Sequence, residues 1–154
     1  MGEYKRSTRE ANISNLNPNA AEFLKSHSEK YELGNVENSV LYCCETTSVK
    51  EIKKLFKTQT ETTVCSIILT PQFLIWATFI NDETPVVMSA RIKDIQIQDY
   101  EKSEFYKLIQ DSGINVKGIY TDIANPGNTF IGLGSEQAAV NFRNKLKEIA
   151  AEMD

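Results

Sequence analysis

The sequence predicts a mainly β domain (β+α), in which an antiparallel barrel of about seven strands is capped by a C-terminal α-helix. Short runs rich in β-branched and aromatic residues are separated by turn signals such as Thr70-Pro71-Gln72 and Asn125-Pro126-Gly127-Asn128. Strands joined by short turns pair antiparallel, and a twisted sheet loses its exposed edges when it closes. After Ser135, which can cap a helix, an amphipathic stripe suits a helix that plugs an open end: Ala139, Phe142, Leu146, Ile149 and Met153.

The N-terminal part divides into a tail and a helix. Residues 1–18 are polar and asparagine-rich without apolar periodicity, which predicts a flexible tail before a single domain over residues 19–154. Residues 19–31 show helical spacing, with Asn19 as a candidate N-cap and Gly34 just beyond the end. The expected buried stripe of this helix is Ala20, Phe23, Leu24, His27 and Tyr31.

The middle of the chain alternates between strand and helix patterns. Strands are predicted over 39–47, 60–70 and 73–80, where β-branched and aromatic residues dominate. Residues 48–57 have a period near 3.6, which predicts a short amphipathic helix with one apolar and one basic side. Its apolar side is Val49, Ile52, Leu55 and Phe56, and its basic side is Lys50, Lys53, Lys54 and Lys57.

The second half of the chain continues the sheet. Strands are predicted over 86–90, 91–98, 114–122 and 129–133, and a short inserted helix over 100–111 ends before Gly113. Gly132 and Gly134 suit a bend from the last strand into the final helix.

Composition and charge exclude several function classes. The apolar fraction of 41% and charged fraction of 25% are those of a folded globular protein. A net charge of −4 disfavours nucleic acid as a partner, and no apolar run approaches the roughly 20 residues of a transmembrane helix. The charged N-terminus lacks the apolar segment of a secretory signal, so we expect a cytoplasmic protein.

The residue types that carry most enzyme chemistry are few and separated. Cys43, Cys44 and Cys65 lie on predicted strands without metal-ligand spacing, and His27 lies on an apolar helix face. We therefore expect buried, inert thiols, a packed histidine, no metal and no cofactor. The sequence predicts a protein that is not an enzyme.

Three segments resemble the pleckstrin-homology-like superfamily, especially its minimal bacterial domains. They are VCSIILTPQFLIWAT, VVMSARIKDIQIQD and GNTFIGLGSEQAAVNFRNKLKEI, and the resemblance spans roughly residues 39–152. It rests on the order of elements, and two features depart from it. Phe142 stands where many members carry a tryptophan in the final helix, and the helix over 103–111 is additional.

The resemblance implies a non-enzymatic binding module, with two kinds of partner left open. Members without a lipid signature commonly accept a peptide along a barrel edge beside the last helix, which makes an unidentified protein or peptide the first expectation. The alternative is an anionic membrane surface, because lipid-binding members use basic residues between their first two strands. The residues in question here are Lys50, Lys53, Lys54 and Lys57. Against this alternative, the same lysines suit the solvated face of any exposed helix.

Overall fold

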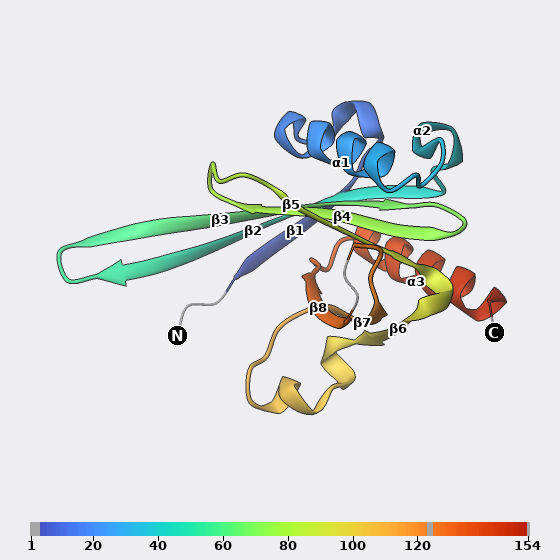
Figure 1. The fold of residues 1–154 in the computed structure, drawn as a ribbon. Helices are drawn as coiled ribbons and strands as arrows, with labels where there is room; N and C mark the ends of the chain where they lie inside the picture. The colour runs from blue at the N-terminus through green and yellow to red at the C-terminus, as the bar shows by residue number, and fades with distance from the viewer. Residues whose placement is uncertain (1–3, 123–124, 154) are drawn as a thin grey trace.

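A computed structural model describes residues 4–122 and 125–153. A five-stranded antiparallel sheet lies between a layer of helices and a layer formed by a three-stranded sheet and the last helix (Figure 1). The first sheet contains β1 (Lys5–Glu10), β2 (Tyr42–Lys54), β3 (Lys57–Leu69), β4 (Phe73–Ile80) and β5 (Val86–Arg91), in that order. The second contains β6 (Ile95–Asp99), β7 (Gly113–Ile119) and β8 (Pro126–Gly132).

The two faces of the first sheet bury different cores, because side chains alternate along each strand. The neighbours Cys43 and Cys44 show this directly. Cys43 belongs to the core under the N-terminal helices, with Leu24 and Ile75. Cys44 belongs to the core on the other face, with Trp76 and other buried residues of the second sheet and last helix.

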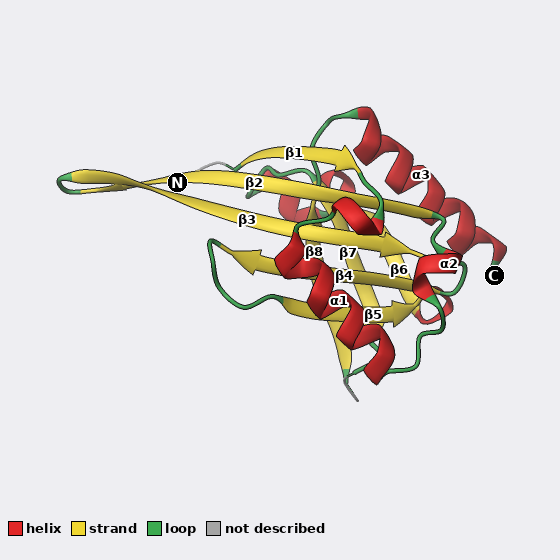
Figure 2. Cartoon of the chain, turned by 90° about the horizontal axis from the view of Figure 1, so that it is seen from above, coloured by secondary structure: helices red, strands yellow, loops and turns green. Residues whose placement is uncertain are grey.

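Helices cover both faces of the five-stranded sheet. The helices α1 (Pro18–Lys30) and α2 (Val36–Ser39) lie on one face, and α1 contacts β4 and β5 (Figure 2). On the other face, α3 (Gln137–Glu152) contacts β1 and β2 and buries Ala139, Phe142, Leu146 and Ile149. The mainly β class, the antiparallel pairing and the C-terminal helix are therefore confirmed, as is the burial of four of the five predicted stripe residues.

The barrel is not formed. Within the described residues, the strands from β1 through β5 pair one after another, and so do the strands from β6 through β8. No hydrogen-bonded ladder joins the two sheets. The two sheets instead pack face to face, and the core between them, with Trp76 from β4 and Val116 from β7, takes the place of edge-to-edge pairing. The predicted barrel is thus corrected to two packed antiparallel sheets, eight strands in all across this part of the chain.

The predicted flexible tail over residues 1–18 is wrong for the described residues 4–18. Lys5–Glu10 is a strand paired with β2, Ile13–Asn15 is a 3₁₀ turn, and α1 begins at Pro18. The N-cap of α1 is Asn17, the residue directly before Pro18. It lies two residues before Asn19, the N-cap predicted from the sequence. Backbone hydrogen bonds to β2 hold this polar segment in place. The sequence did not predict this strand, because the segment has no apolar periodicity.

Two other helix predictions need correction. Residues 100–111 form two 3₁₀ segments, Tyr100–Lys102 and Glu104–Lys107, in place of one α-helix. The helix over 48–57 is absent, and those residues belong to β2, β3 and the turn between them. Strand β4 has the predicted bounds. No helix among the described residues is long and apolar enough to cross a membrane.

Candidate functional site

The four predicted site lysines lie on a β-hairpin. Lys50, Lys53 and Lys54 are in β2, and Lys57 begins β3 after the two-residue turn Leu55-Phe56. The structure therefore keeps the four lysines together and changes the element that carries them. Cross-strand pairing of Lys54 with Lys57 closes the hairpin.

This hairpin extends beyond the strands on either side of it. Pairing with β1 reaches no further than Val49, and pairing with β4 begins at Thr63. Within the described chain, residues 50–61 consequently form strand pairs only with one another, and the ribbon projects away from the body of the molecule (Figures 1 and 2). A two-stranded ribbon gains little stability in water by itself, so such a projection needs a reason other than packing.

The register of the hairpin assigns each lysine to a face. Alternate residues of β2, such as Cys44 and Ser48, point toward the second sheet. Lys50 and Lys54 lie at later positions of the same alternating row. Lys57 is the cross-strand partner of Lys54, so it shares this face. Lys53 points to the opposite face of the ribbon. Three of the four lysines therefore share one face.

The tip of the hairpin is apolar and exposed. The exposed fractions are 88% for Leu55 and 94% for Phe56, the two highest values among the large hydrophobic residues in the described chain. The sequence analysis placed both residues on the apolar side of a helix, and that prediction is wrong because they form the turn of a hairpin. A usable signal was the threonine at every second position over 58, 60 and 62, which favours a strand.

The hairpin also has a charge opposite to that of the rest of the chain. Residues 50–57 carry four lysines and one glutamate, a net charge of +3. Since the whole chain has a formal net charge of −4, the remainder carries −7. Positive charge is thus concentrated around the exposed apolar tip.

Tyr4 joins the base of this ribbon to the body. Its hydroxyl donates to Glu61 Oε1 at 2.9 Å, and its ring lies 5.3 Å from Lys50 Nζ and 4.5 Å from Arg6 Cζ. Burial, together with the hydrogen bond and charge of Glu61, raises the pKa of Tyr4 above its ordinary value. Tyr4 is therefore a neutral hydrogen-bond donor near pH 7, and Glu61 is turned toward the protein.

The groups considered for catalysis are enclosed. All three cysteines are buried, and burial raises the pKa of Cys43 to about 12 and that of Cys65 to about 11. His27 lies 2.8 Å from Ser89 Oγ through Nε2 and packs against the Tyr31 ring, while Ser89 itself is fully buried. The expected packing of the thiols and of His27 is confirmed, and the structure brings no thiol together with this histidine.

Other sequence features have structural explanations. Gly134 N–H donates to Thr8 Oγ1 at 2.8 Å, and a Cβ at Gly134 would meet the backbone of β1, so close approach requires glycine there. Across the residues that the structure describes, no group of three or more His, Cys, Asp or Glu could hold a metal ion.

A groove lies between β6 and α3. Among the described strands, β6 pairs only with β7, and this groove of about 380 Å³ separates it from the end of α3. The groove is lined by Ile95 and Ile97 on the strand and by Lys147, Ala151 and Met153 at the helix end. Its opposite walls are thus an unpaired strand edge and an apolar helix end.

No protein-family model, curated protein or solved structure matches this chain. The function must therefore be argued from the residues themselves.

Proposed function

We propose that this chain is a non-enzymatic binding module that attaches to anionic membrane surfaces through the tip of the β2–β3 hairpin. The observation that carries the proposal is the exposure of Leu55 and Phe56 at the end of a projecting ribbon, between Lys54 and Lys57. Apolar side chains enter the interfacial region of a bilayer, and neighbouring lysines contact anionic head groups. The order of seven strands, β2 to β8, followed by α3 supports the proposed resemblance to the pleckstrin-homology-like superfamily.

The expected affinity is modest. Partial burial of Leu55 and Phe56 contributes about 3 kcal/mol, and three lysines near an anionic surface contribute about 1 kcal/mol each. Together this corresponds to a dissociation constant on the order of 10⁻⁵–10⁻⁴ M. Binding should weaken with salt, because the lysine contribution is screened while the apolar contribution is not.

The test is co-sedimentation with vesicles of phosphatidylcholine alone and of phosphatidylcholine with phosphatidylserine, at low and physiological salt. We expect the protein to pellet with the anionic vesicles, and both K54E/K57E and L55S/F56S to remain in the supernatant. The matched control is K25E/K30E, which reverses two exposed lysines on α1 and should pellet like the unchanged protein. Equal pelleting of the hairpin variants and the control would contradict the proposal.

A second candidate is recognition of a protein or peptide, which the groove beside β6 favours. An extended peptide can add to an unpaired strand edge through main-chain hydrogen bonds and place side chains in an adjoining recess. The test is a pull-down from cell lysate with the intact chain and with Ala151→Arg, which fills the groove from an exposed position. A partner retained by the unchanged protein and lost with this variant supports the candidate. Retention by both proteins counts against it.

A further inference from the structure

A second group of exposed apolar residues lies on the segment between β6 and β7. The exposed fractions are 64% for Phe105, 77% for Leu108 and 56% for Ile109. The sequence predicts a helix over 100–111, whereas the structure has a 3₁₀ segment at Glu104–Lys107, and all three residues are open to solvent. The packing of the core does not explain why these three side chains are exposed. Three neighbouring apolar side chains at a surface favour an interaction site.

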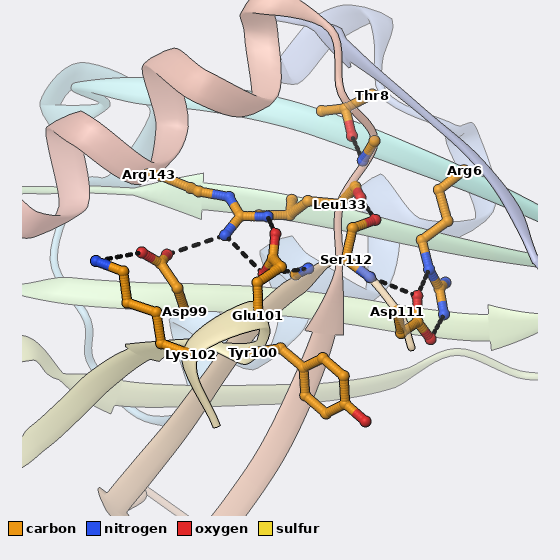
Figure 3. Close-up of polar contacts among 12 residues, drawn as sticks. Arg6, Thr8, Asp99, Tyr100, Glu101, Lys102, Asp111, Ser112, Leu133 and Arg143 are labelled. Carbon is orange, nitrogen blue, oxygen red and sulfur yellow. Dashed lines mark hydrogen bonds and ion pairs between the residues drawn. The ribbon is translucent and has the colours of Figure 1, made fainter. Parts of the chain in front are cut away.

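This segment is held in place by polar contacts at both ends. The Tyr100 hydroxyl donates to the Ile109 carbonyl at 2.6 Å, and the Phe105 carbonyl lies 3.4 Å from the same hydroxyl oxygen. Arg143 pairs with Glu101 at one end, and Arg6 pairs with Asp111 at the other (Figure 3). The apolar side chains are therefore presented on a fixed projection.

A continuous set of contacts connects this projection to the lysine face of the hairpin. Arg6 bonds both Asp111 and Ser48, and Ser48 precedes Lys50 by two residues on the same face of β2. The Tyr4 ring lies against both Arg6 and Lys50. At its base, around Lys50, the lysine face of the hairpin is therefore on the second-sheet side. The 100–112 segment is on that side too, and Figure 1 shows it (yellow to orange) projecting there.

The segment carries two exposed lysines. Glu101 and Asp111 pair with arginines, which leaves Lys102, Lys107 and Glu104 as its other charged side chains. Lys107 is exposed beside the apolar group, as Lys54 and Lys57 are beside the tip, and the exposed Lys102 pairs with Asp99 at 3.8 Å. Apolar residues flanked by cations suit the boundary of an anionic bilayer.

We infer that the hairpin tip and the Phe105, Leu108 and Ile109 group contact the same anionic bilayer, which fixes the orientation of the bound protein. This inference rests on the proposed membrane attachment and adds a second contact to it. In the bound orientation the 100–112 segment faces the lipid and the layer of α1 and α2 points away from it. Two contacts on one rigid body reinforce each other, because the second forms at a high effective concentration.

The test attaches an environment-sensitive fluorophore at single introduced cysteines: Phe56→Cys, Leu108→Cys and, as control on α1, Lys25→Cys. The three native cysteines are buried and should not be labelled in the folded protein. With phosphatidylserine-containing vesicles we expect a blue shift at positions 56 and 108 and none at 25. In parallel, F105S/L108S should weaken vesicle partitioning about tenfold, whereas Val86→Ser, an exposed apolar residue at the start of β5, should not change it.

The outcomes separate this inference from the proposed function. A shift at 56 without one at 108, with F105S/L108S partitioning like the unchanged protein, overturns the inference and leaves the hairpin attachment standing. Absence of vesicle binding by the unchanged protein overturns both, as would be found if the surface served an acidic protein. A shift at 25 equal to that at 108 also overturns the inference, because the orientation would not be fixed.

Discussion

Arg6 and Asp111 form a two-pronged ion pair, with Nε to Oδ1 at 2.8 Å and Nη2 to Oδ2 at 2.7 Å, across 105 residues of sequence. Arg6 also donates to Ser48 Oγ, so one largely buried guanidinium joins β1, β2 and the segment before β7. The pair thereby connects the two projections that we propose to meet the membrane.

Breaking this pair should destabilise the fold. Removing one partner of a buried ion pair leaves the other charge uncompensated, so Arg6→Ala and Asp111→Ala should each lower the free energy of unfolding by about 3 kcal/mol. The double variant should lose less than the sum of the two, as urea denaturation of all four proteins would show. A double variant whose loss equals that sum would mean that the pair does not act as a unit.

The same pair predicts a loss of stability in acid. Burial alone would raise the pKa of Asp111, but hydrogen bonds from Arg6 and from the Ser112 N–H outweigh it and hold the pKa below its ordinary value. A lowered folded-state pKa stabilises the protein above the ordinary value near 4 and stops doing so as the pH falls through the folded value. Unfolding free energies from about pH 5 to pH 2 should therefore fall less steeply in Asp111→Asn. An unchanged slope would contradict the assignment.

His27 predicts a second pH dependence, between pH 7 and pH 5. Burial, with a smaller contribution from Lys30, lowers its pKa, while Asp122 acts in the opposite direction. The unfolded chain then takes up more protons below the ordinary value near 6.5, so stability should decrease as the pH falls through this range. Thermal unfolding of His27→Gln should lack this component. The prediction fails if the melting temperatures of the two proteins change in parallel.

The three cysteines should be unreactive in the folded protein. Burial raises the pKa of each thiol, most strongly for Cys44, so little thiolate forms and access is blocked. Titration with Ellman's reagent at pH 8 should detect no thiol in the native protein and three in guanidinium chloride. Rapid reaction of a native thiol would show that one of these strands opens.

The hairpin tip should contribute nothing to stability. Leu55 and Phe56 are almost fully exposed, so L55S/F56S should change the free energy of unfolding by less than about 0.5 kcal/mol. Leu146→Ala, which empties a fully buried site on α3, should cost about 2–5 kcal/mol in the same assay. A large loss in L55S/F56S would indicate that the tip packs on the protein in solution.

Several features could be predicted from the sequence because they depend on local pattern. Strand β4 is a run of apolar residues, interrupted only by Thr78 and bounded by turns, and the stripe of α3 has the helical period over four turns. The burial of Cys43, Cys44 and Cys65 follows from their placement on apolar strands. His27, one helical turn after the buried Leu24, was expected on the packed face for the same reason.

The candidate site could be predicted only in part. The sequence grouped Lys50, Lys53, Lys54 and Lys57, but residues 48–57 carry a pattern compatible with a helix, and their lysines, glutamate and leucine favour one. Pairing with the threonine-rich start of β3 overrides that preference, since each strand supplies hydrogen-bond partners for the other. The exposure of Leu55 and Phe56 follows from this pairing.

The sequence by itself determined the β-rich class, the final helix, the buried thiols and the basic character of residues 50–57. Only the tertiary structure decided that Lys5–Glu10 is a strand, that the sheets stay open, and that the lysines surround an apolar tip. The physical reason is that these features depend on partners far along the chain, such as β2 for β1 and Asp111 for Arg6, and a local period carries no information about such partners.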